Sequence, residues 1–369
     1  MKIALLEPFY TGSHQQWAET YQQRSQQHVE IFSLPGRHWK WRMHGGAVSL
    51  AKAYLDSGFQ ADLLLASDML DLNTFLGLTR QQTHQIPAVV YFHENQLTYP
   101  WSPDDQDVAK GQDLHYAFIN YTTALAADAV VFNSHYHQAS FLQALPSFLR
   151  RYPDFREADQ VSLIQAKSQV LPLGLSLKKF LPHQPTQAKQ GPAVLLWNHR
   201  WEYDKGPEDF FEAVFSLEAE GVDYRLMVLG ESFQKSPAIF AKAQKELAHR
   251  IIHWGFADSF ESYARLLWQA DILYGCSRQD FFGGSVVEAI YCQCHPILPN
   301  RLAFPEHFPP AQGPHHLYNS TEEGLQMLRQ AIQQIDEIRQ ANHYQNFVAH
   351  YDWSTLAQQY DDTLLKICQ

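Results

Sequence analysis

Short apolar runs alternate along the chain with longer stretches in which apolar residues recur every three or four positions. The short runs, bounded by turn residues, are typical of strands buried on both faces, and the longer stretches are typical of amphipathic helices. The runs that predict strands in the first half are KIALLEP (2–8), HVEIFSLP (28–35), ADLLLASDML (61–70), PAVVYFHEN (87–95), AVVFNS (129–134) and SQVLPLGL (168–175). The stretch after the first strand predicts a helix over 13–25 with Ser13 as its cap.

The same pattern restarts after residues 178–192, a polar stretch rich in Pro, Gln and Lys that we interpret as an interdomain linker. Beyond it, the patterning predicts strands at 193–200, 224–232, 250–257, 271–277 and 295–300, and helices at 206–221, 259–270 and 283–293. Strands that alternate with helices in this way form a parallel sheet covered on both faces.

We therefore expect an α/β fold of two facing Rossmann-like, doubly wound domains with an interdomain cleft. The first domain is expected over 1–177 and the second over 193–352. A last helix within 353–369 is expected to cross back to the first domain. In such sheets, ligands bind beyond the carboxyl ends of the strands.

Composition narrows the class of protein. A chain of 369 residues with 45% apolar residues is long enough for two cores and needs no disulfides. The cysteines, Cys276, Cys292, Cys294 and Cys368, lack the paired spacing of a zinc site, and reduced thiols suit a cytoplasmic protein. The apolar run in MKIALLEPFY is too short for a signal-peptide core, and no run is long enough to span a bilayer. The net charge of -11 argues against non-specific binding to nucleic acid.

The stretch SRQDFFGGSVVEAIYCQCHPI carries the most informative chemical pattern. Gly283 and Gly284 separate a strand from a helix that begins near Ser285, and the amides of such a helix start point at an anion such as phosphate. Asp280 and Glu288 flank this turn, and carboxylates accept hydrogen bonds from vicinal sugar hydroxyls. The alternative interpretation is an ordinary capped helix with solvated acids.

A second pattern, WNHRWEYDKGPEDF, places Arg200 and Lys205 between a strand and a helix that begins near Pro207. Two cations there could neutralise a diphosphate leaving group. The alternative is an exposed connecting loop. Because both patterns follow strands of the second half, their side chains are expected to converge on one site.

The first half has two patterns of the same kind. Each puts small or polar residues directly after a predicted strand, where they could touch a ligand or only form a turn. They are Gly12, Ser13 and His14 in YTGSHQQ, and His93, Glu94 and Asn95 in YFHENQ.

Together these patterns resemble the retaining GT-B glycosyltransferases, which use nucleotide-sugar donors. That family usually has glutamate where this chain has Asp280. The segments FYTGSHQQ, YFHENQLTYP, VVFNSHYHQASF, HRWEYDKGPEDFF, VLGESF, HWGF and FFGGSVVEAIYCQCHPI are, as a set, similar to the tRNA-queuosine α-mannosyltransferase group. This resemblance implies GDP-mannose as the donor and queuosine in the anticodon of tRNA-Asp as the acceptor. It also implies that the first domain faces the acceptor and the second binds the nucleotide sugar.

The resemblance implies a role for each candidate residue. Arg200, Lys205 and the amides of Gly283 to Ser285 would hold the diphosphate, Glu288 the ribose, and Asp280 and His93 the mannose. The remaining donor contacts would be Gly12, Ser13, His14, Asn95 and the backbone near Phe256, which would read the base, while Glu94 lies on the acceptor side. Transfer is expected to retain configuration. No metal is expected, because the one candidate acidic pair, Asp104 and Asp105, lies in a Pro-rich loop.

The segment LPGRHWKWRMHGG is basic although the chain is acidic. No acidic residue occurs between Glu30 and Asp56, and a second acid-free stretch lies between Asp128 and Asp154. We expect these stretches to face tRNA, with cations on phosphates and tryptophans on unpaired bases. The residues concerned are Arg37, Trp39, Lys40, Trp41 and Arg42 in a loop, and Arg150 and Arg151. The alternative is that one tryptophan packs in the core and the charges are merely solvated.

Two other functions stay open on the residues alone. A GT-B enzyme could instead act on a lipid, a glycan or a small molecule, because a fold does not fix the acceptor. A non-catalytic protein that binds sugar nucleotides or RNA is the further alternative. The presence of both candidate cations and both candidate acids of the second domain disfavours an inactive site.

Overall fold

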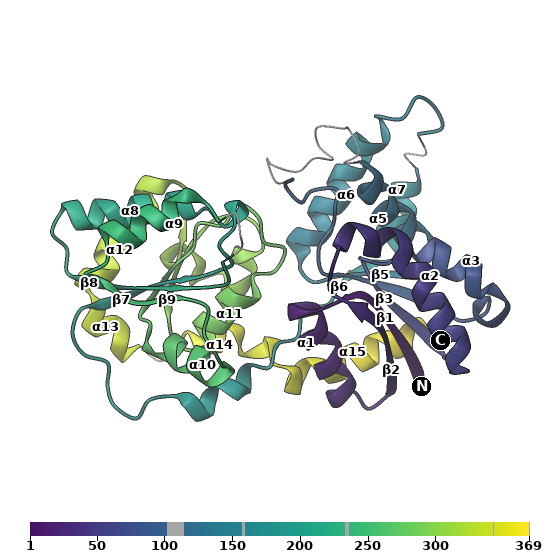
Figure 1. Cartoon of the computed structure of the whole chain (residues 1–369), viewed down its shortest axis with the longest axis horizontal. Helices are drawn as coiled ribbons and strands as arrows, with labels where there is room; N and C mark the ends of the chain where they lie inside the picture. Colours follow the sequence, from purple (N-terminus) through teal and green to yellow (C-terminus); the bar gives the residue numbers. More distant parts are fainter. Residues whose placement is uncertain (102–113, 157–158, 233–235, 342, 369) are drawn as a thin grey trace. The chain divides into compact units, whose positions relative to one another are not determined.

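The computed structural model describes residues 1–101, 114–156, 159–232, 236–341 and 343–368, which form two compact units (Figure 1). Unit 1 comprises Met1–Ser176 together with Trp353–Gln369, and unit 2 comprises Leu177–Asp352. Each unit is built around one parallel sheet, as the alternating pattern predicts.

Unit 1 contains a sheet of six parallel strands in the order β2-β1-β3-β4-β5-β6. Ile3 of β1 pairs with Val29 of β2 on one side and with Leu63 of β3 on the other. Strands paired and covered in this way need apolar residues on both faces, which explains their nearly continuous apolar sequences. The strands are β1 (Lys2–Tyr10), β2 (His28–Pro35), β3 (Leu63–Ser67), β4 (Ala88–Phe92), β5 (Ala129–Phe132) and β6 (Ser168–Val170).

Helices cover both faces of this sheet (Figure 1). On one face, Ala4 and Leu6 of β1 pack against a core to which five helices contribute. On the other face, Trp17 and Tyr21 of α1 pack against Tyr360 of α15. The first group is α2 (Trp39–Ser57), α3 (Leu72–Thr83), α5 (Leu114–Ala126), α6 (His135–Leu149) and α7 (Gln160–Ala166), and the second is α1 (Gly12–Arg24) and α15 (Trp353–Ile367).

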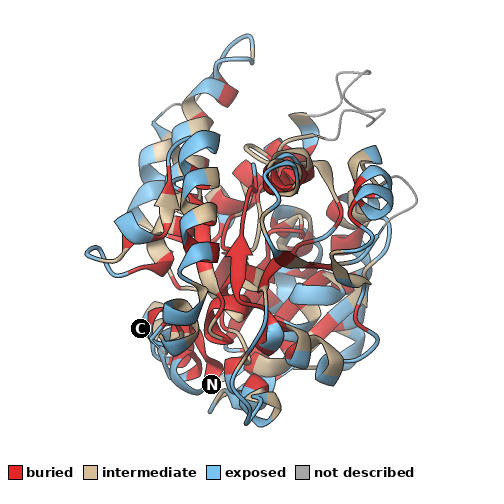
Figure 2. Cartoon of the chain, turned by 90° about the vertical axis from the view of Figure 1, so that its left-hand side faces the viewer, coloured by how far each residue is buried: buried red, intermediate tan, exposed pale blue. Residues whose placement is uncertain are grey.

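Unit 2 repeats this plan, with strand order β12-β11-β10-β7-β8-β9. Figure 2 shows that the buried residues concentrate in the strands and on the inward sides of the helices. The strands are β7 (Ala193–Asn198), β8 (Tyr224–Leu229), β9 (Ile251–Gly255), β10 (Ile272–Tyr274), β11 (His295–Pro299) and β12 (Leu317–Tyr318). The α-helices are α8 (Pro207–Ala219), α9 (Ala238–Glu246), α10 (Phe260–Gln269), α11 (Gly284–Tyr291), α12 (Thr321–Gln333), α13 (Ile335–Gln340) and α14 (Gln345–Val348). The 3-10 helices are η1 (Leu177–His183), η2 (Tyr203–Lys205), η3 (Phe304–His307), η4 (Gly313–His315) and η5 (Ala349–Tyr351).

Several local expectations need correction. Ser13 does not cap α1, because Thr11 occupies the cap position and makes no side-chain cap hydrogen bond. The stretch 178–192, interpreted as a linker, lies in unit 2 and begins inside η1, where buried Phe180 accepts a hydrogen bond from Trp268 at 2.8 Å. The short strand β12 escaped prediction because two residues show no periodicity.

None of the helices in the described ranges combines the length and the apolar character that crossing a bilayer requires.

The two ends of unit 1 are joined by a buried carboxylate. Asp361 of α15 is almost fully buried and accepts hydrogen bonds from Tyr21, Ser25 and the backbone N–H of Gln26, at 2.9, 2.5 and 2.7 Å. These donors all belong to α1 and the turn after it. The carboxylate therefore fixes α15 against α1.

We predict that Asp361→Ala lowers the free energy of unfolding by about 3 kcal/mol, because it leaves buried donors without an acceptor. Urea unfolding of the full chain measures the change. The matched control is Asp362→Ala, whose carboxylate is exposed and, among the described residues, accepts a hydrogen bond from Gln358 in the same helix. Equal unfolding midpoints for the two variants would contradict the assignment.

Candidate functional site

Two loops of unit 2 meet at Lys205. Its ammonium donates to the carbonyl oxygen of Gln279 at 2.7 Å and lies 3.1 Å from Asp280 Oδ1 and 3.2 Å from Asp204 Oδ2. Lys205 follows β7, whereas Gln279 and Asp280 follow β10, the neighbouring strand. The structure thus brings together Lys205 and Asp280, two candidates from separate sequence patterns.

Gly206 makes this meeting possible. Its φ is +67°, in the left-handed region, and a Cβ there would collide with the carbonyl oxygen of Cys276 after β10. Only glycine combines that backbone conformation with so close an approach.

The electrostatics of this cluster favour the charged forms. Burial alone would lower the pKa of Lys205, but Asp280 and then Asp204 outweigh it and the pKa is raised. Burial alone would raise the pKa of Asp280, but the surrounding groups, Lys205 first among them, together outweigh burial and the pKa is lowered. Both groups are therefore charged at neutral pH. A buried ammonium that is already matched to carboxylates can exchange partners with an anionic ligand without being newly desolvated.

The second candidate acid, Glu288, lies within α11 and is held by Tyr263 of α10. Tyr263 donates to Glu288 Oε2 at 2.7 Å, and Asn198 Nδ2 donates to the Tyr263 hydroxyl at 3.0 Å and to the Ser285 carbonyl at 2.9 Å. Burial raises the pKa of Glu288, and the bond from Tyr263 acts in the opposite direction. This chain of hydrogen bonds fixes one carboxylate oxygen, and no residue in the described part of the chain donates a hydrogen bond to Oε1.

The other candidates of unit 2 also lie at carboxyl ends of strands. Arg200 follows β7, is half exposed and lies 3.2 Å from Glu202. Gly283 occupies the cap position of α11, so Gly284 and Ser285 form the first turn of that helix. Phe256 follows the edge strand β9 and is 70% exposed.

His199 belongs to this site and was not among the sequence candidates. Burial, more than any charge nearby, lowers its pKa to about 4, so the ring is neutral. Its Nε2, like Nε2 of Gln279, is buried with no hydrogen-bond partner among the described residues. Such atoms are normally satisfied, so they indicate a place that a polar ligand would complete. The signal was present in the sequence, because His199 follows its strand just as His93 does.

In unit 1, the structure brings His14 and His93 together and adds Glu7. His14 Nδ1 lies 3.0 Å from Glu7 Oε2, and the rings of His14 and His93 are 4.3 Å apart. Burial would lower the pKa of His14, but the fully buried Glu7 outweighs it and raises the pKa to about 9. Burial, and then the charge of His14, place the pKa of His93 well below its usual value. One histidine is therefore cationic at neutral pH and its neighbour is neutral.

Asp68 supports this cluster from the end of β3. Its Oδ1 accepts from the His93 backbone N–H at 2.7 Å, while its Oδ2 and His93 Nε2 are buried without partners among the described residues. Asn95 Oδ1 caps the following turn by accepting from Thr98 N at 3.0 Å, and Glu94 accepts from Gln96 at 2.9 Å. Gly12 and Ser13 begin α1 and are exposed. Sequence analysis missed both Glu7, an acid inside an apolar strand, and Asp68, an acid at a strand end.

Within the described part of the chain, one group could hold a metal ion. Glu7, His14 and His93 each offer a ligand atom, and these atoms lie within 4.8 Å of one another. In the structure, however, His14 Nδ1 is engaged by Glu7. Asp104 and Asp105, the pair considered in the sequence, lie outside the described residues.

The basic segment does not form the expected loop, because α2 begins at Trp39. Its two tryptophans also differ: Trp39 packs 5.1 Å from Tyr116, whereas Trp41 is 63% exposed. Arg37 is exposed, Lys40 lies over the rings of Trp39 and Trp101, and Arg42 donates to the Pro35 carbonyl. Arg150 and Arg151 follow α6 and are exposed.

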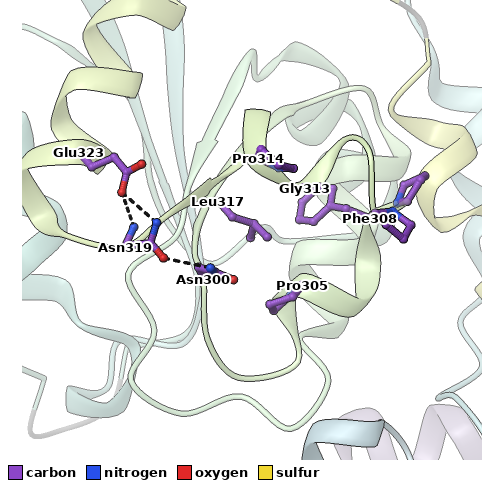
Figure 3. A pocket seen from close by; sticks show the side chains of 10 residues that line it. Asn300, Pro305, Phe308, Gly313, Pro314, Leu317, Asn319 and Glu323 are labelled. Atoms are coloured by element: carbon purple, nitrogen blue, oxygen red, sulfur yellow. Dashed lines mark hydrogen bonds between the residues drawn. The ribbon is translucent and has the colours of Figure 1, made fainter.

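A separate hollow in unit 2, of about 390 Å³, follows β11 and β12 (Figure 3). It is lined mainly by prolines and apolar residues, and its polar side is formed by Asn300, Asn319 and Glu323 (Figure 3). None of the sequence candidates lines it. It has no cation to meet a phosphate, so the cluster around Lys205 is the better candidate site.

The chain is similar to known proteins along most of its length. Residues 2–175 match the family described as tRNA-queuosine alpha-mannosyltransferase N-terminal, and residues 180–319 match glycosyl transferases group 1. A tRNA-queuosine alpha-mannosyltransferase from Drosophila melanogaster is 34% identical over 329 residues, which cover 86% of this chain and 84% of the relative.

Solved structures agree with this result at the level of fold. Sucrose-phosphate synthase from Thermosynechococcus elongatus has a TM-score of 0.68 at 16% identity, covering 100% of this chain and 99% of that one. HepE from Anabaena, solved in complex with UDP, has a TM-score of 0.66 at 16% identity, covering 99% of this chain and 100% of that one. The two parallel sheets together with these likenesses establish the GT-B fold. The chain belongs to the tRNA-queuosine alpha-mannosyltransferase family.

Proposed function

We propose that this protein transfers mannose from GDP-mannose to queuosine in the anticodon of tRNA-Asp, with retention of configuration. The observation that carries the proposal is the cluster at the carboxyl ends of β7 and β10, in a chain that is 34% identical to a tRNA-queuosine alpha-mannosyltransferase. Three buried free cysteines fit a cytoplasmic enzyme.

The donor diphosphate is assigned to Lys205, Arg200 and the amides that begin α11. As the bond between the sugar and the phosphate breaks, negative charge accumulates on the leaving diphosphate. Lys205 is buried and protonated, so its charge acts at low local dielectric. Arg200 is half exposed, and a flexible arginine can close on a phosphate with two parallel hydrogen bonds.

The sugar and ribose hydroxyls are assigned to the carboxylates that flank the start of α11. Glu288 presents Oε1 while Tyr263 holds its other oxygen, which suits a ribose hydroxyl as hydrogen-bond donor. Asp280 and the unpartnered Nε2 of His199 are assigned to the mannose. In unit 1, neutral His93 is assigned to the mannose and cationic His14 to a donor phosphate.

Retention follows if the acceptor attacks the face that the diphosphate leaves. The bond from C1 to the phosphate oxygen breaks while the bond from C1 to the queuosine hydroxyl oxygen forms on the same side. The hydroxyl proton passes to the departing phosphate oxygen. The sugar has oxocarbenium character at this point, and the fixed charges around the diphosphate lower the barrier.

The first prediction concerns the activity itself. Purified protein with GDP-mannose and queuosine-containing tRNA-Asp should add one hexose to queuosine, detected by mass spectrometry of the digested nucleosides. The same tRNA with guanosine at that position is the control. GDP should raise the melting temperature more than UDP, because ligands that bind the folded state stabilise it. Hexose transfer to a lipid or glycan, with none to queuosine, would refute the proposal.

A second prediction tests the two cations. Arg200→Ala and Lys205→Ala should each lower kcat by roughly 10²-fold or more, because each removes charge that stabilises the leaving group. Arg265→Ala is the matched control, since Arg265 is an exposed partner of Glu261 on α10. The melting temperature of each variant establishes that it is folded. Near-normal kcat in both test variants would remove them from the mechanism.

We also propose that no metal ion takes part, because Lys205, Arg200 and the start of α11 already supply positive charge for the diphosphate. Activity should therefore be unchanged after dialysis against EDTA. Metal analysis of the purified protein provides the control for the group of Glu7, His14 and His93. Loss of activity that one divalent ion restores would disprove metal independence.

A further inference from the structure

The start of α2 carries positive charge that does not stabilise the helix. Lys40 and Arg42 lie in its first turns, Arg37 precedes it, and the first turn contains no acidic residue. Cations near a helix N-terminus interact unfavourably with the helix dipole. His38 at the cap position has φ +53° and makes no side-chain cap bond. The helix dipole therefore gains no stabilisation from these cations, which favours an anionic partner.

Trp41 is positioned beside these cations by Gly45, one turn further along α2. A Cβ at Gly45 would lie 2.6 Å from Cζ2 and 2.8 Å from Cε2 of the Trp41 ring. The missing side chain thus allows the indole to rest against the helix, while 63% of Trp41 stays exposed. His44 and Val48 share this exposed side at helical spacing.

Trp39 was expected to stack on a base of the tRNA, but it packs against other side chains of unit 1. It packs against Tyr116 and contacts Trp101 at 6.2 Å, next to the small core of Met43 and Met69. The Lys40 ammonium lies 5.6 Å from the Trp39 ring centre and 5.3 Å from that of Trp101, within the range of cation–π attraction. Trp39 therefore helps to hold Lys40, and Trp41 is the tryptophan available to a partner.

We propose that Trp41 is a stacking platform for an unpaired base of the tRNA, with Arg37 and Arg42 on the flanking phosphates and Gly45 as the residue that positions the indole. This inference rests on the proposed function, because it assumes a tRNA acceptor. Single-stranded RNA is the partner that combines an exposed π-face with regularly spaced negative charges. The sequence stretch between Glu30 and Asp56 contains no acidic residue and complements that charge, although the whole chain has a net charge of -11.

The test is the affinity of the full chain for fluorescently labelled queuosine tRNA without donor, beside the KM of each substrate. Trp41→Ala should weaken tRNA binding by about 5- to 150-fold, the range that corresponds to the loss of one stacked base. Gly45→Ala should weaken it similarly because the added methyl displaces the indole, whereas Trp41→Phe should retain most of it. Leu78→Ala is the matched control and should change nothing, because Leu78 is an apolar residue of α3 that is also more than half exposed. The KM for GDP-mannose should be unchanged in all variants.

Salt dependence tests the phosphate contacts separately. Arg37→Ala combined with Arg42→Ala should reduce the slope of log affinity against log salt by about 1.4, since each contact to a single strand contributes about 0.7. Unchanged tRNA affinity in Trp41→Ala and Gly45→Ala would overturn the platform while leaving the mannosyl transfer intact. A loss in Trp41→Phe as large as in Trp41→Ala would exclude stacking. If the unmodified chain binds no tRNA, the proposed function fails together with this inference.

Discussion

The proposed donor site in unit 2 depends on one buried ammonium. Lys205 joins the loop after β7 to the loop after β10, and its partners are a backbone carbonyl and two carboxylates. A lone charge at this depth would be costly, and two lone carboxylates would be equally so. Their mutual attraction keeps Lys205 and Asp280 charged, and it places Asp280 beside the group assigned to the diphosphate. The contacts of Lys205 therefore hold the two loops together and also keep Lys205 and Asp280 charged.

Unit 1 uses the same principle on a pair of histidines. Glu7 is buried inside a strand of otherwise apolar residues, and its charge is met by His14. Since His14 is protonated, its positive charge adds to burial in keeping the adjacent His93 neutral. Two chemically identical side chains thereby acquire different properties, one as a cation and one as a neutral hydrogen-bonding group. The buried carboxylate of Glu7 is the cause of this difference between the two histidines.

Opposite charges meet in the clusters around Lys205 and Glu7, whereas the start of α2 is arranged unfavourably for helix stability. Its cations lie at the positive end of the helix dipole and its first turn lacks a side-chain cap, yet α2 is anchored by buried residues further along, such as Leu50 and Tyr54. Packing of the later turns permits an unfavourable first turn. The binding surface proposed here thus depends on the core that lies behind it.

The sequence by itself determined the two parallel sheets, since strands buried on both faces must be continuously apolar and must alternate with helices. It also placed Arg200, Lys205 and Asp280 after the carboxyl ends of strands, because each follows an apolar run, and it placed Glu288 in the helix that comes next. Tertiary structure alone decided which of these groups touch. The contact between Lys205 and Asp280 joins residues 75 positions apart, and the burial of Trp39 beside the exposure of Trp41 depends on Tyr116 from another helix. Periodicity reports which side of an element is apolar, but contacts between elements arise only when strand order and helix packing bring distant segments together.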